Sequence, residues 1–173
     1  GGGDWAKLDG YSALLIACFA SDLAIARLLL EAGASTELRV HESGMTVLMF
    51  IAVISAPAGG IPAAELLLDC SAEVNAVAVD GSTPLIVAAG MGCTAMVEIL
   101  LARGANEHLK DTEGNTALVL AVRRGHLDTA RALLEAGADA DSTNQQSITV
   151  AKIAVLKKNV PMLQLLLRYG ASA

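Results

Sequence analysis

The sequence is built on an internal repeat, which constrains its fold more than any other feature. Three markers keep the same phase five times: a hydroxyl residue before an apolar run, a leucine pair, and a glycine or serine followed by alanine. The hydroxyls are Ser12, Thr46, Thr83, Thr116 and Thr149, and the glycine or serine positions are Gly33, Ser71, Gly104, Gly137 and Gly170. The last intervals of both series are 33 residues. A period of this length indicates a stacked array, because no single unit can bury its apolar face alone.

The stretch 80–109 shows what one unit contains. Thr83 is a favourable helix N-cap, because its hydroxyl can accept a hydrogen bond from a free backbone N–H. We expect a short apolar helix after it that ends at Gly90-Met91-Gly92, and a second helix over Thr94–Arg103. Gly104 then suits a left-handed C-terminal cap, since glycine has no Cβ to clash there. The predicted unit is two helices, a cap and an extended loop.

Specific residues of the third and fourth units resemble the ankyrin-repeat family. The third unit has Gly81-Ser82-Thr83-Pro84-Leu85, and the fourth has Gly125-His126-Leu127 and Gly137-Ala138-Asp139. The Thr-Pro-Leu-His signature of the family is incomplete, because Ile86 replaces its histidine. The resemblance covers about residue 8 to the last residue. It implies an all-α solenoid of stacked helix-turn-helix units with extended loop or β-turn connections, in which His126 bonds locally to the backbone.

The phase of the markers predicts the domain organisation. We expect a lead-in at 1–8, with Gly1–Gly3 a cloning remnant, and one ankyrin-repeat domain at 9–173. The predicted repeats span 9–41, 42–79, 80–112, 113–145 and 146–173. Repeat two is longer than the others, and we place most of its insertion at 55–62. Its apolar residues are either an added contact or tolerated variation, because a loop insertion costs little.

Repeat five has the composition expected of a terminal repeat. It introduces Lys152, Lys157, Lys158 and Gln164, which we expect to face water where another repeat would otherwise pack.

Composition excludes several functions. The net charge of −6 argues against a general nucleic-acid binder. The apolar stretch 45–68 is long enough to span a membrane, but its prolines and glycines break it, and we expect no membrane insertion. The three cysteines are an odd number without metal-type spacing, and Cys18 falls on a core position. We therefore expect free thiols and an intracellular location, cytoplasmic or nuclear.

The sequence contains no recognisable catalytic constellation. The three histidines, His41, His108 and His126, do not share a repeat position with the cysteines. Gly90-Met91-Gly92 lacks the lysine and the preceding strand of a phosphate-binding loop. We expect no enzyme activity, no cofactor and no metal site.

The resemblance implies a concave groove lined by loop tips and first helices, which binds another protein. Family positions transferred to this chain give nine candidate partner-binding residues: Tyr11, Phe19, Met45, Val53, Met91, Asn115, Arg123, Arg124 and Lys157. The set is apolar in repeats one to three and basic in repeats four and five. That pattern favours a partner segment with apolar anchors and acidic residues at one end. The opposing interpretation is that several apolar members pack between neighbouring repeats.

We therefore predict a non-enzymatic protein–protein interaction module or scaffold. Three alternatives remain open at this point. The chain could regulate a partner enzyme by inhibiting or localising it, it could be the targeting region of a longer enzyme or membrane protein, or it could be a structural spacer. Fold alone does not separate them, because function in this family depends on surface residues.

Overall fold

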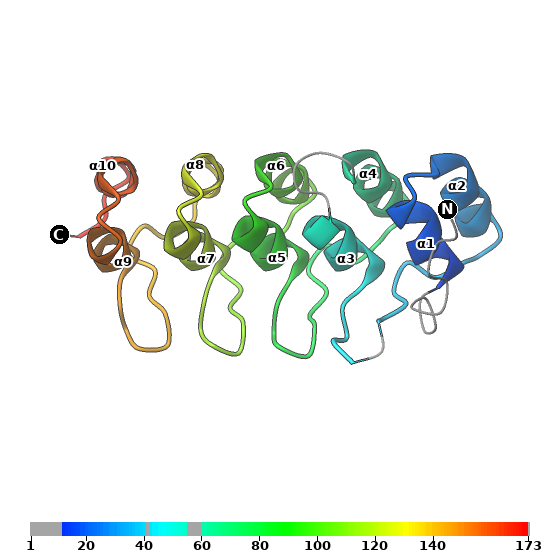
Figure 1. Cartoon of the computed structure of the whole chain (residues 1–173), viewed down its shortest axis with the longest axis horizontal. Helices are drawn as coiled ribbons and strands as arrows, with labels where there is room; N and C mark the ends of the chain where they lie inside the picture. The colour runs from blue at the N-terminus through cyan, green and yellow to red at the C-terminus, as the bar shows by residue number, and fades with distance from the viewer. Residues whose placement is uncertain (1–11, 41, 55–59, 173) are drawn as a thin grey trace, which may run out of the picture.

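The computed structural model describes residues 12–40, 42–54 and 60–172. The helices of these ranges follow one another in pairs (Figure 1). The pairs are α1 (Ala13–Phe19) with α2 (Leu23–Glu31), α3 (Val47–Ile54) with α4 (Ile61–Asp69), α5 (Pro84–Met91) with α6 (Thr94–Ala102), α7 (Ala117–Arg124) with α8 (Leu127–Glu135), and α9 (Val150–Leu156) with α10 (Val160–Arg168). The predicted all-α solenoid is confirmed.

Each first helix begins at a residue that the repeat pattern predicted. The five hydroxyls accept a hydrogen bond from the backbone N–H three residues later, at distances from 3.1 Å for Ser12 to 3.4 Å for Thr46. These bonds satisfy one of the N–H groups that a helix start leaves without an intrahelical partner. The local sequence therefore fixes where every unit starts.

The second helices end in the same conformation five times. The residue after each C-cap has a positive φ, from 65° at Ser71 to 106° at Gly137. Ser71 adopts the left-handed conformation although it carries a Cβ, which costs roughly 1–2 kcal/mol relative to glycine. The predicted caps are confirmed, and the serine is the strained one.

The helices form two layers. The first helices lie side by side in one row, the second helices form a parallel row beside them, and the loops extend from the opposite side of the first row (Figure 1). The core runs between the layers, where Leu67, Leu100 and Leu133 are fully buried. These residues belong to the leucine pairs that the sequence singled out, so burial follows the repeat.

The loops are joined by one backbone hydrogen bond that recurs in register. The N–H groups of Val79, Thr112 and Gln145 donate to the carbonyls of Ser43, Asp80 and Glu113 in the preceding loops, at 3.0, 2.9 and 3.2 Å. Gly81 lies beside this ladder, and a Cβ on it would lie 2.7 Å from the Thr112 nitrogen. The loops thus continue the stack, and each positions its neighbour.

Two predicted boundaries can be compared with the helices. The first helix of repeat three ends within the predicted break Gly90-Met91-Gly92: α5 continues through Gly90 to Met91, and Gly92 takes the left-handed position with φ of 72°. In repeat two, α4 begins at Ile61, so the last two residues of the predicted 55–62 insertion are helical. The rest of that insertion, apart from Gly60, lies outside the described residues, as do the lead-in, Tyr11 and His41.

Candidate partner-binding surface

The ends of the first helices form a row along the stack. Six predicted site residues belong to it, which we call the first-helix row: Phe19, Val53, Met91, Arg123, Arg124 and Lys157. They fall seven or eight residues after the capping hydroxyls. Because the first helices lie side by side, equivalent positions on consecutive helices lie next to each other (Figure 1). The sequence prediction therefore identified one continuous set of positions, not scattered residues.

The apolar members of this row are accessible at the first end of the stack. Phe19 is 61% exposed, although Cys18 beside it is 1% exposed. Val53, at the same position in repeat two, is 36% exposed. Met91 is half-buried. Exposed aromatic and branched side chains next to a packed core are suitable anchors for a partner.

One member of the row was missed by the sequence reasoning. Leu156 lies seven residues after Thr149, the position that Phe19 and Val53 take in their repeats, and it is 73% exposed. Counting from the capping hydroxyl would have found it. Leu156 adds an apolar side chain beside Lys157, at the end of the row where the prediction had only basic residues.

The two arginines are held by neighbouring groups. Arg124 donates through Nη1 to the carbonyl oxygen of Gly90 at 2.9 Å, next to the C-terminal end of α5. A cation there offsets the partial negative charge of that helix end. Arg123 forms an ion pair with Glu113 in the loop, with Nη1 3.8 Å from Oε2. These contacts orient both guanidinium groups before any partner arrives.

His126 reaches the same carbonyl, which corrects its predicted role. Its Nε2 lies 3.2 Å from the Gly90 oxygen in the preceding repeat, so the imidazole links two repeats instead of bonding locally. A carbonyl oxygen only accepts, and Nε2 must therefore carry the proton. The ring also packs on Gly92, where an added Cβ would lie 2.5 Å from Nδ1. His126 is a structural residue.

Two predicted site residues face the interior. Asn115 has 0% exposure, and its Nδ2 donates to both carboxylate oxygens of Asp111 at 3.1 and 2.9 Å. Met45, at the equivalent position of repeat two, is partly buried against Met49, Ala76 and Ala78. Met45 packs against the following loop through Ala76 and Ala78, whereas Asn115 bonds within its own loop. We leave Asn115 and Met45 out of the partner surface, while Tyr11 lies outside the described residues.

The titratable groups give the surface no evident chemistry. Across the part of the chain that the structure describes, no three His, Cys, Asp or Glu residues gather in a way that could hold a metal ion. Burial raises the pKa of the Cys18 thiol to about 11, so it is protonated at neutral pH. A protonated, buried thiol is a poor nucleophile. In the described ranges no helix has the length and apolar character needed to cross a membrane.

Paired helices stacked in register and joined by a ladder of loops define a helical-repeat solenoid. Comparison with known proteins gives the family. Ankyrin repeats in three copies match residues 54–144 and 104–173, and a single ankyrin repeat matches residues 9–39. The chain belongs to the ankyrin-repeat family, whose members are generally non-enzymatic protein–protein interaction modules.

One similar protein is the nuclear factor NF-kappa-B p105 subunit of Gallus gallus. The two sequences are 33% identical over 94 residues, which cover 54% of this chain. The matched stretch is 9% of the length of the p105 subunit. This similarity supports the repeat assignment and concerns a small part of that protein.

Proposed function

We propose that this ankyrin stack binds a segment of another protein along the first-helix row. One observation carries the proposal: row residues such as Phe19, Val53 and Arg124 are exposed on helices whose other positions are largely buried. The residues five positions after the capping hydroxyls have the opposite environment. Ile51, Ala88 and Ala121 occupy this position in repeats two to four, and all are 0% exposed. Side chains such as Phe19 are therefore not required by the core.

The charges of the row favour a particular partner chemistry. Arg123, Arg124 and Lys157 are presented between and beside the apolar positions Val53 and Leu156. A partner segment with apolar anchors and acidic residues between them matches this order. Because the arginines are already oriented by Gly90 and Glu113, little side-chain freedom is lost when the partner binds.

A reducing compartment inside the cell suits this proposal. Cys18 and Cys70 are free thiols, and Cys18 and Cys93 are buried. Free thiols persist where glutathione and thioredoxin keep them reduced. We therefore place the interaction in the cytoplasm or nucleus.

The test compares captured proteins between matched variants. The row variant carries Phe19→Ser and Arg124→Glu. The control variant carries Ile25→Ser and Arg131→Glu, the same kinds of change at exposed positions of the second helices. Each protein is immobilised, exposed to extract of the source cells, and analysed by quantitative mass spectrometry after its melting curve is recorded.

We expect a protein that the parent and the control retain and the row variant loses. Equal retention by all three forms would move the binding site away from the first-helix row. A captured enzyme would next be assayed with and without the domain, because a changed rate distinguishes a regulator from a targeting or scaffold region. Capture of no protein by any form would favour a structural spacer.

A further inference from the structure

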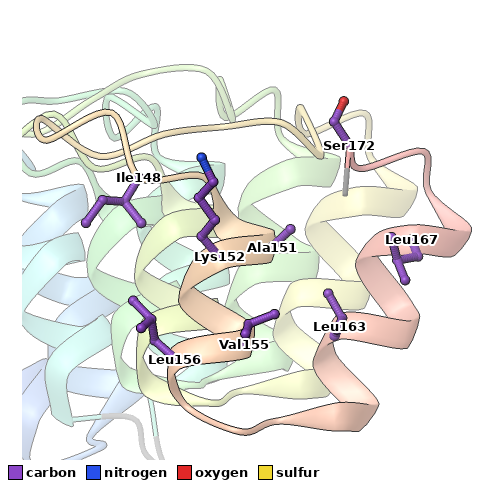
Figure 2. Close-up of a pocket in the computed structure, with 8 residues that line it drawn as sticks. All are labelled: Ile148, Ala151, Lys152, Val155, Leu156, Leu163, Leu167 and Ser172. Atoms are coloured by element: carbon purple, nitrogen blue, oxygen red, sulfur yellow. The ribbon is translucent and has the colours of Figure 1, made fainter.

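The outer surface of repeat five contains an apolar hollow. It lies across α9 and α10 at the end of the described stack, and its volume is about 480 Å³ (Figure 2). Val155 of α9 and Leu163 and Leu167 of α10 line it, and their side chains lie on the same side of the two helices (Figure 2). We call the surface formed by these three residues with Lys152 and Leu156 the end face. It shares Leu156 with the first-helix row and is otherwise made of different residues.

The repeat register shows what surface this is. The residues 33 positions before Lys152, Val155, Leu163 and Leu167 lie on α7 and α8, and all four are buried where repeat five packs on repeat four. For positions 152, 155, 163 and 167 they are Val119 at 0%, Val122 at 1%, Ala130 at 0% and Leu134 at 5% exposure. On the end face, Val155 is 57% and Leu167 is 45% exposed. The end face continues the surface by which one repeat packs on the next.

Of these four positions, only 152 has a charged residue in place of a buried apolar one. Lys152 stands where Ile86 and Val119 are buried between repeats, and it lines the hollow with its amine near the loop side (Figure 2). Lys157 and Lys158 follow directly after Leu156, at the turn between α9 and α10. Residues 142–173 contain four cationic and no acidic side chains. A unit that covers this face gains by carrying carboxylates opposite the lysines.

We propose that the end face docks an amphipathic helix of another protein, with apolar side chains in the hollow and acidic residues facing Lys152 and the α9–α10 turn. The inner interfaces support a helical occupant, because α9 and α10 cover the equivalent surface of α7 and α8. Helices bind apolar grooves through residues spaced three and four apart. This surface is additional to the one proposed above.

Other occupants fit the charges less well. A further unit of the same kind as repeats three and four presents apolar side chains to the position of Lys152. Two copies joined symmetrically through this face bring Lys152 of each copy toward the same interface, and like charges oppose such pairing. Neither arrangement places carboxylates opposite Lys152 and the two lysines of the α9–α10 turn.

The experiment is a selection from a peptide library on the immobilised domain. The library consists of helix-forming peptides with leucine fixed at one face and Glu, Lys or Gln randomised on the flanks. Enriched peptides are synthesised with a fluorophore and titrated against three forms: the parent, Val155→Arg and Phe19→Arg. The last two exchange one exposed apolar side chain for arginine at opposite ends of the stack, and melting curves establish that both remain folded.

We expect enrichment of glutamate on the flanks and at least about tenfold weaker binding to Val155→Arg, with binding to Phe19→Arg within about twofold of the parent. The Lys152→Glu variant should bind the glutamate-containing peptides more weakly than the parent does. It should bind the same peptides with lysine in place of glutamate more tightly than the parent does. Enrichment without glutamate, or equal loss in Val155→Arg and Phe19→Arg, would overturn the proposal. Self-association of the parent that Val155→Arg abolishes would make a second copy the occupant and overturn it as well.

A negative result here leaves the first-helix row untouched, since Phe19→Arg and the row variant report on that surface. Failure of the row to bind a segment equally leaves the end face testable through Val155→Arg. The two proposals can therefore fail independently.

Discussion

Repeats four and five have nearly the same local structure and very different surroundings. In repeat four, Val119 and Val122 are buried under the next helix pair; in repeat five, the equivalent Lys152 and Val155 face outward. The turns differ in the same sense, because Gly125 takes a left-handed conformation with φ of 83° where Lys158 has φ of 54°. The comparison teaches that a repeat owes its helices to its own sequence and its packing to its neighbours.

The largest expected difference is in the unfolding free energy lost when a leucine is replaced by alanine at an inner interface or at the end face. Leu100→Ala and Leu133→Ala should each lower the free energy of unfolding by about 2–5 kcal/mol, because both side chains are fully buried. Leu167→Ala at the half-exposed end face should cost less than about 1 kcal/mol. Urea titrations followed by circular dichroism measure all three. Similar losses for Leu133→Ala and Leu167→Ala would mean that the end face is covered in solution.

The turns should show the next largest effect. Gly92→Ala forces alanine into a left-handed conformation and places its Cβ against the His126 ring. We expect a loss of about 2–4 kcal/mol from the backbone cost and the overlap together. Gly125→Ala has the backbone cost without the overlap, because its Cβ would meet only Asn159 at 3.8 Å, and it should lose about 1–2 kcal/mol. In thermal denaturation, Gly92→Ala should have a lower melting temperature than Gly125→Ala. The reverse order would contradict the packing of the His126 ring on Gly92.

Alkaline pH tests how tightly the first repeat is packed. Burial raises the pKa of Cys18 from 9.0 to about 11, so the unfolded chain loses this proton before the folded one. Its contribution to stability is complete below pH 9 and should be lost as the pH rises to about 11, by up to about 2–3 kcal/mol. The difference in unfolding free energy between the parent and Cys18→Ala, measured across this range, isolates the thiol. A difference independent of pH would show that Cys18 is accessible to water in solution.

The smallest expected effect is a gain. Lys158→Gly should stabilise the chain by up to about 1 kcal/mol, because glycine removes the Cβ from a left-handed residue. Lys158→Gln keeps the Cβ while removing the charge, and its melting temperature should stay close to that of the parent. A gain of the same size in both variants would mean that charge, not backbone conformation, limits the turn.

Much of the fold could be predicted from local sequence. Thr83 and Thr116 cap helices because the groups they bond lie three residues away. Gly104 and Gly137 end helices because their own backbone conformation requires it. The predicted break at Gly90-Met91-Gly92 was less exact, because the sequence did not show which glycine ends the helix. α5 continues through Gly90 to Met91 and Gly92 is the cap, and a glycine within a helix costs only about 1 kcal/mol.

The candidate surface was predicted less completely. Phe19, Val53 and Lys157 are accessible in the first-helix row, whereas Met45 and Asn115 are not. Met45 is covered by Ala76 and Ala78 of the following loop, which its own position in the sequence does not reveal. Asn115 bonds to Asp111 four residues earlier, and only the folded loop brings the two side chains together. Leu156 shows the reverse case, since its exposure depends on the absence of a following repeat within the described residues.

The sequence by itself determined the number of units, the start and end of their helices, and the ankyrin-repeat class, because each of these depends on residues a few positions apart. The tertiary structure decided which apolar side chains are covered, and it brought Arg124 and His126 to one carbonyl in the preceding repeat. It also left the face of α9 and α10 open around Lys152. Burial is a property of two surfaces in contact, and a repeat encodes only one of them.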